Sequence, residues 1–304
     1  MKLRFKLNHL YQGQNAPFLH AVDAGLFAER GLEVEFVEGF SSSLVTRAIA
    51  SGEADCGYGD VSSLMTHAVD TGAATIQAVM PVYRRSPCAL GYLRPGPALA
   101  LHEIEGGVLC GPRGDTSARL LPLLLAKNGL AGIPYEMRFV DPEERDALVA
   151  GGRVLAATCF DATLKFAMIM RGHDSSAVRF LYFADHGLDI YTGAVVCRAD
   201  LLVAHPRLLD DLRAVTHRAW LDCLADPALG VAAVTARAPW LDPALVRAQL
   251  EWVTSRQIFP DGPSDMAFER DGDQMAATVD CALLGREGLG AFTRESLIAA
   301  VCPA

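Results

Sequence analysis

Residues 41–70, SSSLVTRAIASGEADCGYGDVSSLMTHAVD, constrain the fold more than any other stretch. After a run of serines that can cap a helix, apolar residues recur at helical spacing, so a helix is expected from Leu44. A short strand is expected at 54–58 and a second helix near Ser62. The segment GYGD at 57–60 is expected to turn between them and to present an exposed carboxylate at a helix N-terminus. Such a place can hold a polar small molecule with backbone N–H groups.

The rest of the chain repeats this alternation of strand and helix. Strands are expected at 2–7, 32–37, 75–82, 88–93, 107–110, 136–140, 155–159, 180–184 and 191–197. Helices are expected at 16–27, 116–128, 142–151, 206–224, 228–237, 243–254 and 273–283. The rhythm predicts mostly parallel sheets with helices on both faces. The Pro/Gly cluster at 94–97 is a suitable place to cross between lobes.

Composition and charge exclude several classes of protein. With 304 residues, 51% of them apolar and 21% charged, the chain is globular and long enough for two cores. A net charge of −9 and no basic run interleaved with aromatics argue against a nucleic-acid partner. No stretch approaches the roughly 18–20 apolar residues that cross a bilayer, so no membrane insertion is expected.

The eight cysteines form no CxxC pair and stand at no metal-ligand spacing. Most lie inside apolar strands or helices, which predicts buried free thiols and favours a reducing compartment. The N-terminus MKLRFKLNHL is typical of a strand and has no apolar signal core. We therefore expect a periplasmic protein if a signal peptide has been removed, and a cytoplasmic one otherwise.

Several short motifs occur in an order that is more specific than any one of them. They are YQGQNAPF at 11–18, AVDAGLF through GLEV at 21–34, ASGEADCGYG at 50–59, GPRGDTS at 111–117, ADHGLDIY at 184–191 and the segment 206–226. Together they resemble the nitrate/taurine/sulfonate (NitT/TauT) class of ABC-transporter substrate-binding proteins and the related thiamine-pyrimidine synthases. The resemblance implies the α/β type II periplasmic-binding-protein fold, with two lobes and a ligand cleft between them. We expect lobe 1 at 1–93 plus 195–304 and lobe 2 at 94–194.

The resemblance does not extend to the chemistry of the synthases. Those proteins use a Lys and a His near the third strand and a later run of cysteines. Here the lysines stand at 2, 6, 127 and 165, none of them in that place, and no cysteine cluster follows. We therefore expect no pyridoxal-phosphate chemistry, no cofactor, no metal site and no catalytic residue.

Candidate ligand residues lie where strands end or helices begin. Asp60 can bind an amine or a pyrimidine N–H, can cap the following helix, or can do both. The helix start at 115–117 suits an anion, although its aspartate would repel one unless Arg113 compensates. Acidic candidates outnumber basic ones, which favours a neutral or cationic, heteroaromatic ligand. The predicted ligand-binding residues are Tyr11, Gln12, Asn15, Ser42, Tyr58, Asp60, Arg113, Asp115, Thr116, Ser117, Asp161, Asp189 and Tyr191.

Three functions are compatible with these residues. The first is a solute-binding protein that captures a small polar or heteroaromatic molecule for ABC-type uptake, with an ABC permease as partner if the chain is exported. The second is a cytoplasmic enzyme of the same fold, in thiamine-pyrimidine precursor synthesis or with a desulfinase-like reaction. There, Cys56 or Cys159 would act as nucleophile beside His20 or His186. The third is an intracellular sensor that binds without transport.

Overall fold

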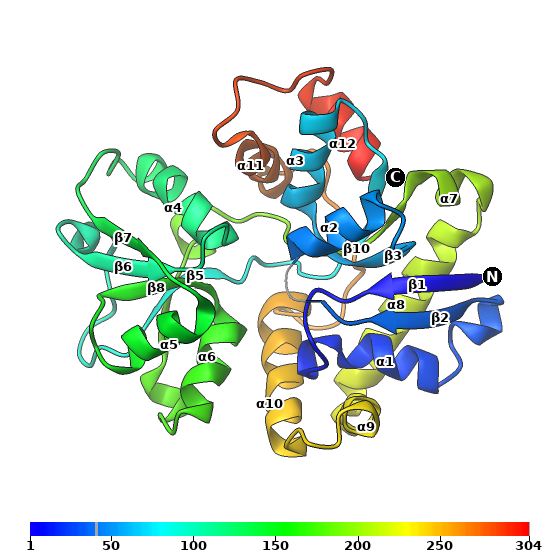
Figure 1. Ribbon diagram of the computed structural model, residues 1–304, viewed down its shortest axis with the longest axis horizontal. Coiled ribbons are helices and arrows are strands. Elements are labelled where there is room, and N and C mark those ends of the chain that lie inside the picture. Colours follow the sequence, from blue (N-terminus) through cyan, green and yellow to red (C-terminus); the bar gives the residue numbers. More distant parts are fainter. Residues whose placement is uncertain (40–41, 304) are drawn as a thin grey trace. The chain divides into compact units, whose positions relative to one another are not determined.

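The computed structural model describes residues 1–39 and 42–303 and divides the chain into two compact units (Figure 1). Unit 1 comprises Met1–Arg85 and Ile190–Ala304, and unit 2 comprises Ser86–Asp189. Unit 1 is therefore discontinuous, and the crossings lie after Arg85 and Asp189, whereas the expected lobe boundaries are 93 and 194. The strand that begins at Cys88 belongs to unit 2, because it pairs with strands of the second sheet.

Unit 1 is built on a five-stranded sheet of order β2-β1-β3-β10-β4. Its strands are β1 (Lys2–Lys6), β2 (Glu33–Val37), β3 (Cys56–Asp60), β4 (Ile76–Pro81) and β10 (Gly193–Arg198). All run parallel except β10, which pairs antiparallel with both β3 and β4. The carboxyl ends of four strands and the amino end of β10 therefore meet at one edge of the sheet.

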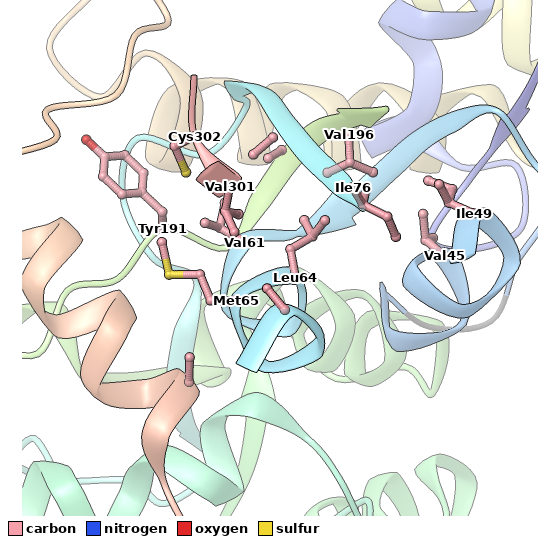
Figure 2. Close-up of a cluster of buried hydrophobic side chains, with 14 of the residues drawn as sticks. Val45, Ile49, Val61, Leu64, Met65, Ile76, Tyr191, Val196, Val301 and Cys302 are labelled. Atoms are coloured by element: carbon pink, nitrogen blue, oxygen red, sulfur yellow. The ribbon is translucent and has the colours of Figure 1, made fainter. Parts of the chain in front are cut away.

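Helices cover both faces of this sheet (Figure 1). One layer holds α1 (Ala16–Asp23), α8 (Leu208–Ala225), α9 (Pro227–Arg237) and α10 (Pro243–Val253). The other holds α2 (Ser42–Ala50), α3 (Val61–Thr71), α11 (Asp273–Leu283) and α12 (Arg294–Val301). Figure 2 shows the core beneath the second layer, where side chains of α2 and α3 meet Val196 of β10 and Val301 of α12. The short helix α7 (Ala199–Ala204) follows β10 directly.

Unit 2 repeats the topology of unit 1 with the order β7-β6-β8-β5-β9. Its strands are β5 (Cys88–Tyr92), β6 (Val108–Gly111), β7 (Glu136–Phe139), β8 (Ala156–Phe160) and β9 (Arg179–Tyr182). The fourth strand is again the antiparallel one. Its helices are α4 (Thr116–Lys127), α5 (Pro142–Ala150) and α6 (Asp161–Met170). In both units the antiparallel strand is the first one after the chain enters that unit from the other.

Short helical turns complete both units. They are η1 (Gly13–Asn15), η2 (Ala28–Arg30), η3 (Leu101–Ile104), η4 (Ser175–Ala177), η5 (Ala184–His186) and the π-helical η6 (Thr254–Ile258). Within residues 1–39 and 42–303, no single helix is long and apolar enough to cross a membrane. The bent pair α8 and α9 meets that test only when both helices are counted together.

The segment Gly57–Asp60 is part of strand β3, so the expected turn there is wrong. Its glycines serve close packing: a Cβ on Gly57 would lie 2.5 Å from the Lys6 carbonyl oxygen and 2.8 Å from Cγ1 of Val45. A Cβ on Gly59 would lie 3.0 Å from a methyl group of Val196. The glycines thus let strand β1 and helix α2 approach β3, and α3 begins directly at Val61.

Other boundaries also differ from expectation. The first helix ends at Asp23 and not at 27, because the chain turns through Gly25, whose φ is +74°. Helices α6 and α12 were not expected from the sequence. The eight cysteines are all free and buried, which confirms the expectation drawn from their apolar neighbours.

Candidate functional site

The loop after β1 in unit 1 is fixed by helix α10. The Gly13 amide donates to Oε1 of Gln249 at 2.9 Å, and a Cβ on Gly13 would lie 2.3 Å from the Val246 carbonyl oxygen. Only glycine therefore fits between this loop and α10. The Tyr11 amide donates to Oε1 of Glu38 at 2.8 Å, which ties the loop to the end of β2. Burial, with Glu38 nearby, raises the pKa of the Tyr11 phenol.

Asn15, at the start of α1, is fully buried and holds one unused hydrogen-bond acceptor. Its Nδ2 donates to the Leu10 carbonyl oxygen at 3.0 Å. That bond fixes the orientation of the amide, because a carbonyl accepts only from the nitrogen. Its Oδ1 is buried with no hydrogen-bond partner among the described residues. The Nε2 of Gln12 is also buried with no hydrogen-bond partner among the described residues.

Tyr58 and Asp60 lie on the face of β3 that meets α1. The Tyr58 ring lies 5.1 Å from the Phe18 ring of α1 and 6.0 Å from the Tyr83 ring, centroid to centroid. Because side chains alternate along a strand, Asp60 projects from the same face as Tyr58. Burial and the neighbouring Tyr83 raise the pKa of the Tyr58 phenol well above its usual value.

Asp60 caps α3 with one carboxylate oxygen only. Its Oδ1 accepts from the Ser63 amide at 2.8 Å and from the Ser62 hydroxyl at 2.6 Å. Its Oδ2 is buried without a partner in the described part of the chain, and the residue is 2% exposed. The capping role is therefore confirmed, whereas the expected exposure of this carboxylate is wrong. A buried polar atom without a partner is costly, and such atoms in native structures call for an explanation.

Further polar side chains with unused atoms lie at this edge, and the sequence reasoning missed them. Asn8 Oδ1 and His9 Nδ1 follow β1, Thr192 Oγ1 precedes β10, and Thr46 Oγ1 lies on α2; these four atoms are buried without partners among the described residues. Burial lowers the pKa of His9, against the opposing influence of Glu38. Asn8 and His9 could have been proposed from the sequence, because they stand directly beyond the end of the strand expected at 2–7.

Two other candidates of this unit have different surroundings. Ser42 is the first residue of α2, and its side chain lies outside the described residues. Tyr191 belongs to the core of Figure 2, where its amide donates to the Thr278 hydroxyl at 2.8 Å. Its own hydroxyl accepts from the Glu269 amide at 2.9 Å, and its ring packs on Phe268. These contacts place Tyr191 in the core packing of unit 1.

In unit 2 the predicted residues at the start of α4 have internal partners. Asp115 caps the helix through the Ala118 amide at 3.2 Å, and burial raises its pKa against a hydrogen bond from Thr158. Ser117 donates to the Cys159 carbonyl oxygen at 2.8 Å. Arg113 is exposed and lies over the Phe139 ring, 4.8 Å from its centroid. Thr116 is the half-buried first residue of α4.

The two other carboxylates of unit 2 are also engaged. Asp161 is fully buried; its Oδ1 accepts from the Ala162 amide at 2.6 Å and its Oδ2 from the Tyr182 hydroxyl at 2.9 Å. Asp189 accepts from the Ser86 amide at 2.8 Å, which joins the first and last residues of the unit. These bonds give each carboxylate a structural role.

Two cavities lie away from the candidate residues. One, of about 660 Å³, is in unit 2 beside the amino ends of β6 and β8. The other, of about 400 Å³, is in unit 1 between β4 and α8. Neither is lined by a predicted ligand residue.

The geometry does not support a thiol nucleophile at the positions considered. Cys56 and Cys159 are fully buried, and burial raises the pKa of each thiol well above its usual value. A reactive cysteine needs the opposite environment. His20 lies 3.5 Å from a carboxylate oxygen of Asp222. The described residues contain no group of three or more His, Cys, Asp or Glu placed to hold a metal ion.

The comparisons with known proteins agree with this architecture. Residues 12–229 match the family model described as NMT1/THI5 like. The chain belongs to the NMT1/THI5-like family. Comparison with curated protein sequences finds no match.

Several solved structures resemble the present one. The alkanesulfonate-binding protein SsuA from Xanthomonas axonopodis pv. citri, bound to MOPS, is 16% identical, with a TM-score of 0.68 and coverage of 99% of this chain and 97% of that one. The periplasmic aliphatic sulphonate binding protein SsuA from Escherichia coli is 15% identical, with a TM-score of 0.73 and coverage of 97% and 91%. The CA3427 gene product of Candida albicans, with the generic periplasmic-binding-protein fold, is 12% identical, with a TM-score of 0.65 and coverage of 99% and 96%. The predicted type II periplasmic-binding-protein fold is therefore confirmed.

Proposed function

We propose that this NMT1/THI5-like protein is a solute-binding protein that captures a small polar or heteroaromatic molecule for ABC-type uptake. The observation that carries the proposal is the group of buried, unpartnered polar atoms at one edge of the unit 1 sheet. It includes Asp60 Oδ2 and Asn15 Oδ1, which belong to residues that are 2% and 0% exposed. In α/β sheets, ligands bind beyond the carboxyl ends of the strands. A ligand at this edge would supply the missing partners.

The comparisons support the same function. The two SsuA proteins bind sulfonates, and the one from E. coli is periplasmic. By analogy, the partner proposed for this chain is an ABC permease, and the proposed location is the periplasm. The alternative of an enzyme is less well supported, because Cys56 and Cys159 are buried with raised pKa values.

The proposal is tested by measuring binding and turnover together. The purified protein is screened by thermal shift against amines, aminopyrimidines, thiamine precursors, carboxylates and sulfonates, and each stabilising compound is recovered and identified by mass spectrometry. A ligand at 100 times its Kd adds about 2.7 kcal/mol to the stability of the folded state. We expect stabilising compounds to be recovered unchanged. Conversion of such a compound into a product, or no stabilisation by any compound, would overturn the proposal.

A further inference from the structure

We infer that the ligand inserts a nitrogen group that donates N–H bonds, an amine, amidine, guanidine or amino-heterocycle, into the strand-end edge of unit 1. This inference rests on the proposed function and adds the chemical class of the ligand. It is argued from the polar atoms at that edge whose identity as donor or acceptor is fixed by the structure.

Both fixed atoms are acceptors. A carboxylate oxygen can only accept, so Asp60 Oδ2 requires a donor. Asn15 Oδ1 is an acceptor because Nδ2 of the same amide already donates to the Leu10 carbonyl oxygen. Both residues are at least 98% buried, so neither atom is exposed to bulk solvent. The remaining atoms fit either role, since hydroxyls donate and accept and the imidazole and the Gln12 amide can be turned.

The two acceptors belong to one face of the sheet. Asp60 projects from the face of β3 on which Tyr58 contacts Phe18, and Phe18 lies on α1 only one turn after Asn15. The Tyr58 and Tyr83 rings lie on this face too. A Cβ on Gly193, the residue opposite Asp60 in β10, would lie 2.8 Å from the Tyr58 hydroxyl. Aromatic rings beside two acceptors suit a flat or aliphatic body that carries an N–H group.

Charge at this edge favours a cation over an anion. No ion pair joins Asp60 to a basic side chain of the described residues. Three basic side chains of neighbouring segments hydrogen-bond elsewhere: Lys6 to the Glu38 carbonyl oxygen, Arg84 to the Ser264 hydroxyl and Arg237 to the Asp23 carboxylate. A sulfonate placed against Asp60 would meet an unneutralised carboxylate in a buried setting, where charge repulsion is strong. A donor bonded to a charged acceptor is instead among the stronger hydrogen bonds.

The indole Nε1 of Trp220 is a donor without a partner among the described residues. It lies on α8, and its ring contacts the Phe18 ring of α1 edge-on at a centroid distance of 6.3 Å. We therefore assign it to the core between α1 and α8. It does not alter the acceptor character of the atoms on β3 and at the start of α1.

The test uses the full chain and a panel of matched compounds. Each amine, amidine, guanidine or aminopyrimidine is paired with the sulfonate and the carboxylate of the same carbon skeleton, and Kd is measured by calorimetry. Asp60→Asn keeps the size and the helix cap but removes the charge and presents a donor. Asp141→Asn is the matched control, because Asp141 caps α5 in the same way from an exposed position.

We expect nitrogen compounds to bind and their affinity to fall roughly tenfold to a hundredfold in Asp60→Asn, with no change in Asp141→Asn. If only sulfonates or carboxylates bind, and Asp60→Asn binds them equally well or better, the ligand class is wrong while the solute-binding function stands. If no compound binds, and mass spectrometry finds no small molecule released on denaturing the purified protein, both the class and the function are wrong.

Discussion

Asp60→Asn should stabilise the ligand-free protein while it weakens ligand binding. In the free protein Asp60 Oδ2 is buried without a partner among the described residues, whereas Oδ1 holds the cap of α3. An unsatisfied buried charged group costs about 1–3 kcal/mol or more. Asparagine caps helices about as well as aspartate, and replacing the charge forfeits about 0.3–1 kcal/mol of interaction with the helix dipole. These two ranges leave a net gain of up to about 2.7 kcal/mol.

For a unit of this size, each kcal/mol of such a gain raises Tm by about 2–4 °C. The assay is differential scanning calorimetry of protein that has been unfolded, dialysed and refolded to remove any bound molecule. Asp141→Asn serves as control, because its cap is exposed and has no buried oxygen to relieve, so its Tm should stay level or fall slightly. A Tm for Asp60→Asn that falls further than that of the control would refute the reasoning, since it would mean that Oδ2 is already stabilised in the free protein.

Three other predictions follow from particular contacts. Gly57→Ala should lower the free energy of unfolding by about 1–3 kcal/mol, because the new Cβ would lie 2.5 Å from the Lys6 carbonyl oxygen. Gly288→Ala is the control, since a Cβ there meets nothing within 4 Å. Chemical denaturation should show a far smaller loss of unfolding free energy for Gly288→Ala than for Gly57→Ala. The lowered pKa of His9 means that the unfolded chain binds a proton that the folded chain does not, once pH falls below the ordinary histidine value. Stability should therefore fall between pH 7 and pH 5, and less steeply in His9→Gln; equal slopes in denaturant titrations would contradict this. The eight buried thiols should resist a thiol reagent in the native protein and all react in denaturant, and rapid labelling of Cys56 or Cys159 in the native state would reopen the enzyme alternative.

Much of the fold could be predicted because periodicity and punctuation are local. The strand at 2–7, the helix at 116–128 and the helix at 273–283 are found within a residue or so of their expected bounds. The turn predicted at 57–60 was wrong for a non-local reason. Glycines usually indicate a turn, but here they make room for Val45 of α2 and for the backbone of β1. Neither contact can be predicted from the residues next to these glycines in the sequence. The prediction that the strand at 88–93 belongs to lobe 1 was wrong for a similar reason. This strand, β5, pairs with β8 and β9, whose residues lie about 70 to 90 positions further along the chain.

The candidate site could be predicted only in part, because residue type does not reveal which atoms remain unpaired. Asp60, Asp115 and Asp161 all stand at helix starts in the structure, and the sequence made each of them a candidate ligand group. Asp161 uses both oxygens, one of them on Tyr182 from the neighbouring part of its unit. Asp60 uses one oxygen, and the tyrosine beside it, Tyr58, packs against Phe18 and Tyr83. The distinction between a structural carboxylate and a candidate ligand group therefore arises from partners supplied by tertiary packing. The same reasoning explains why Asn15, a neutral amide, becomes as informative as the aspartate: one bond to the Leu10 carbonyl oxygen fixes its unused atom as an acceptor.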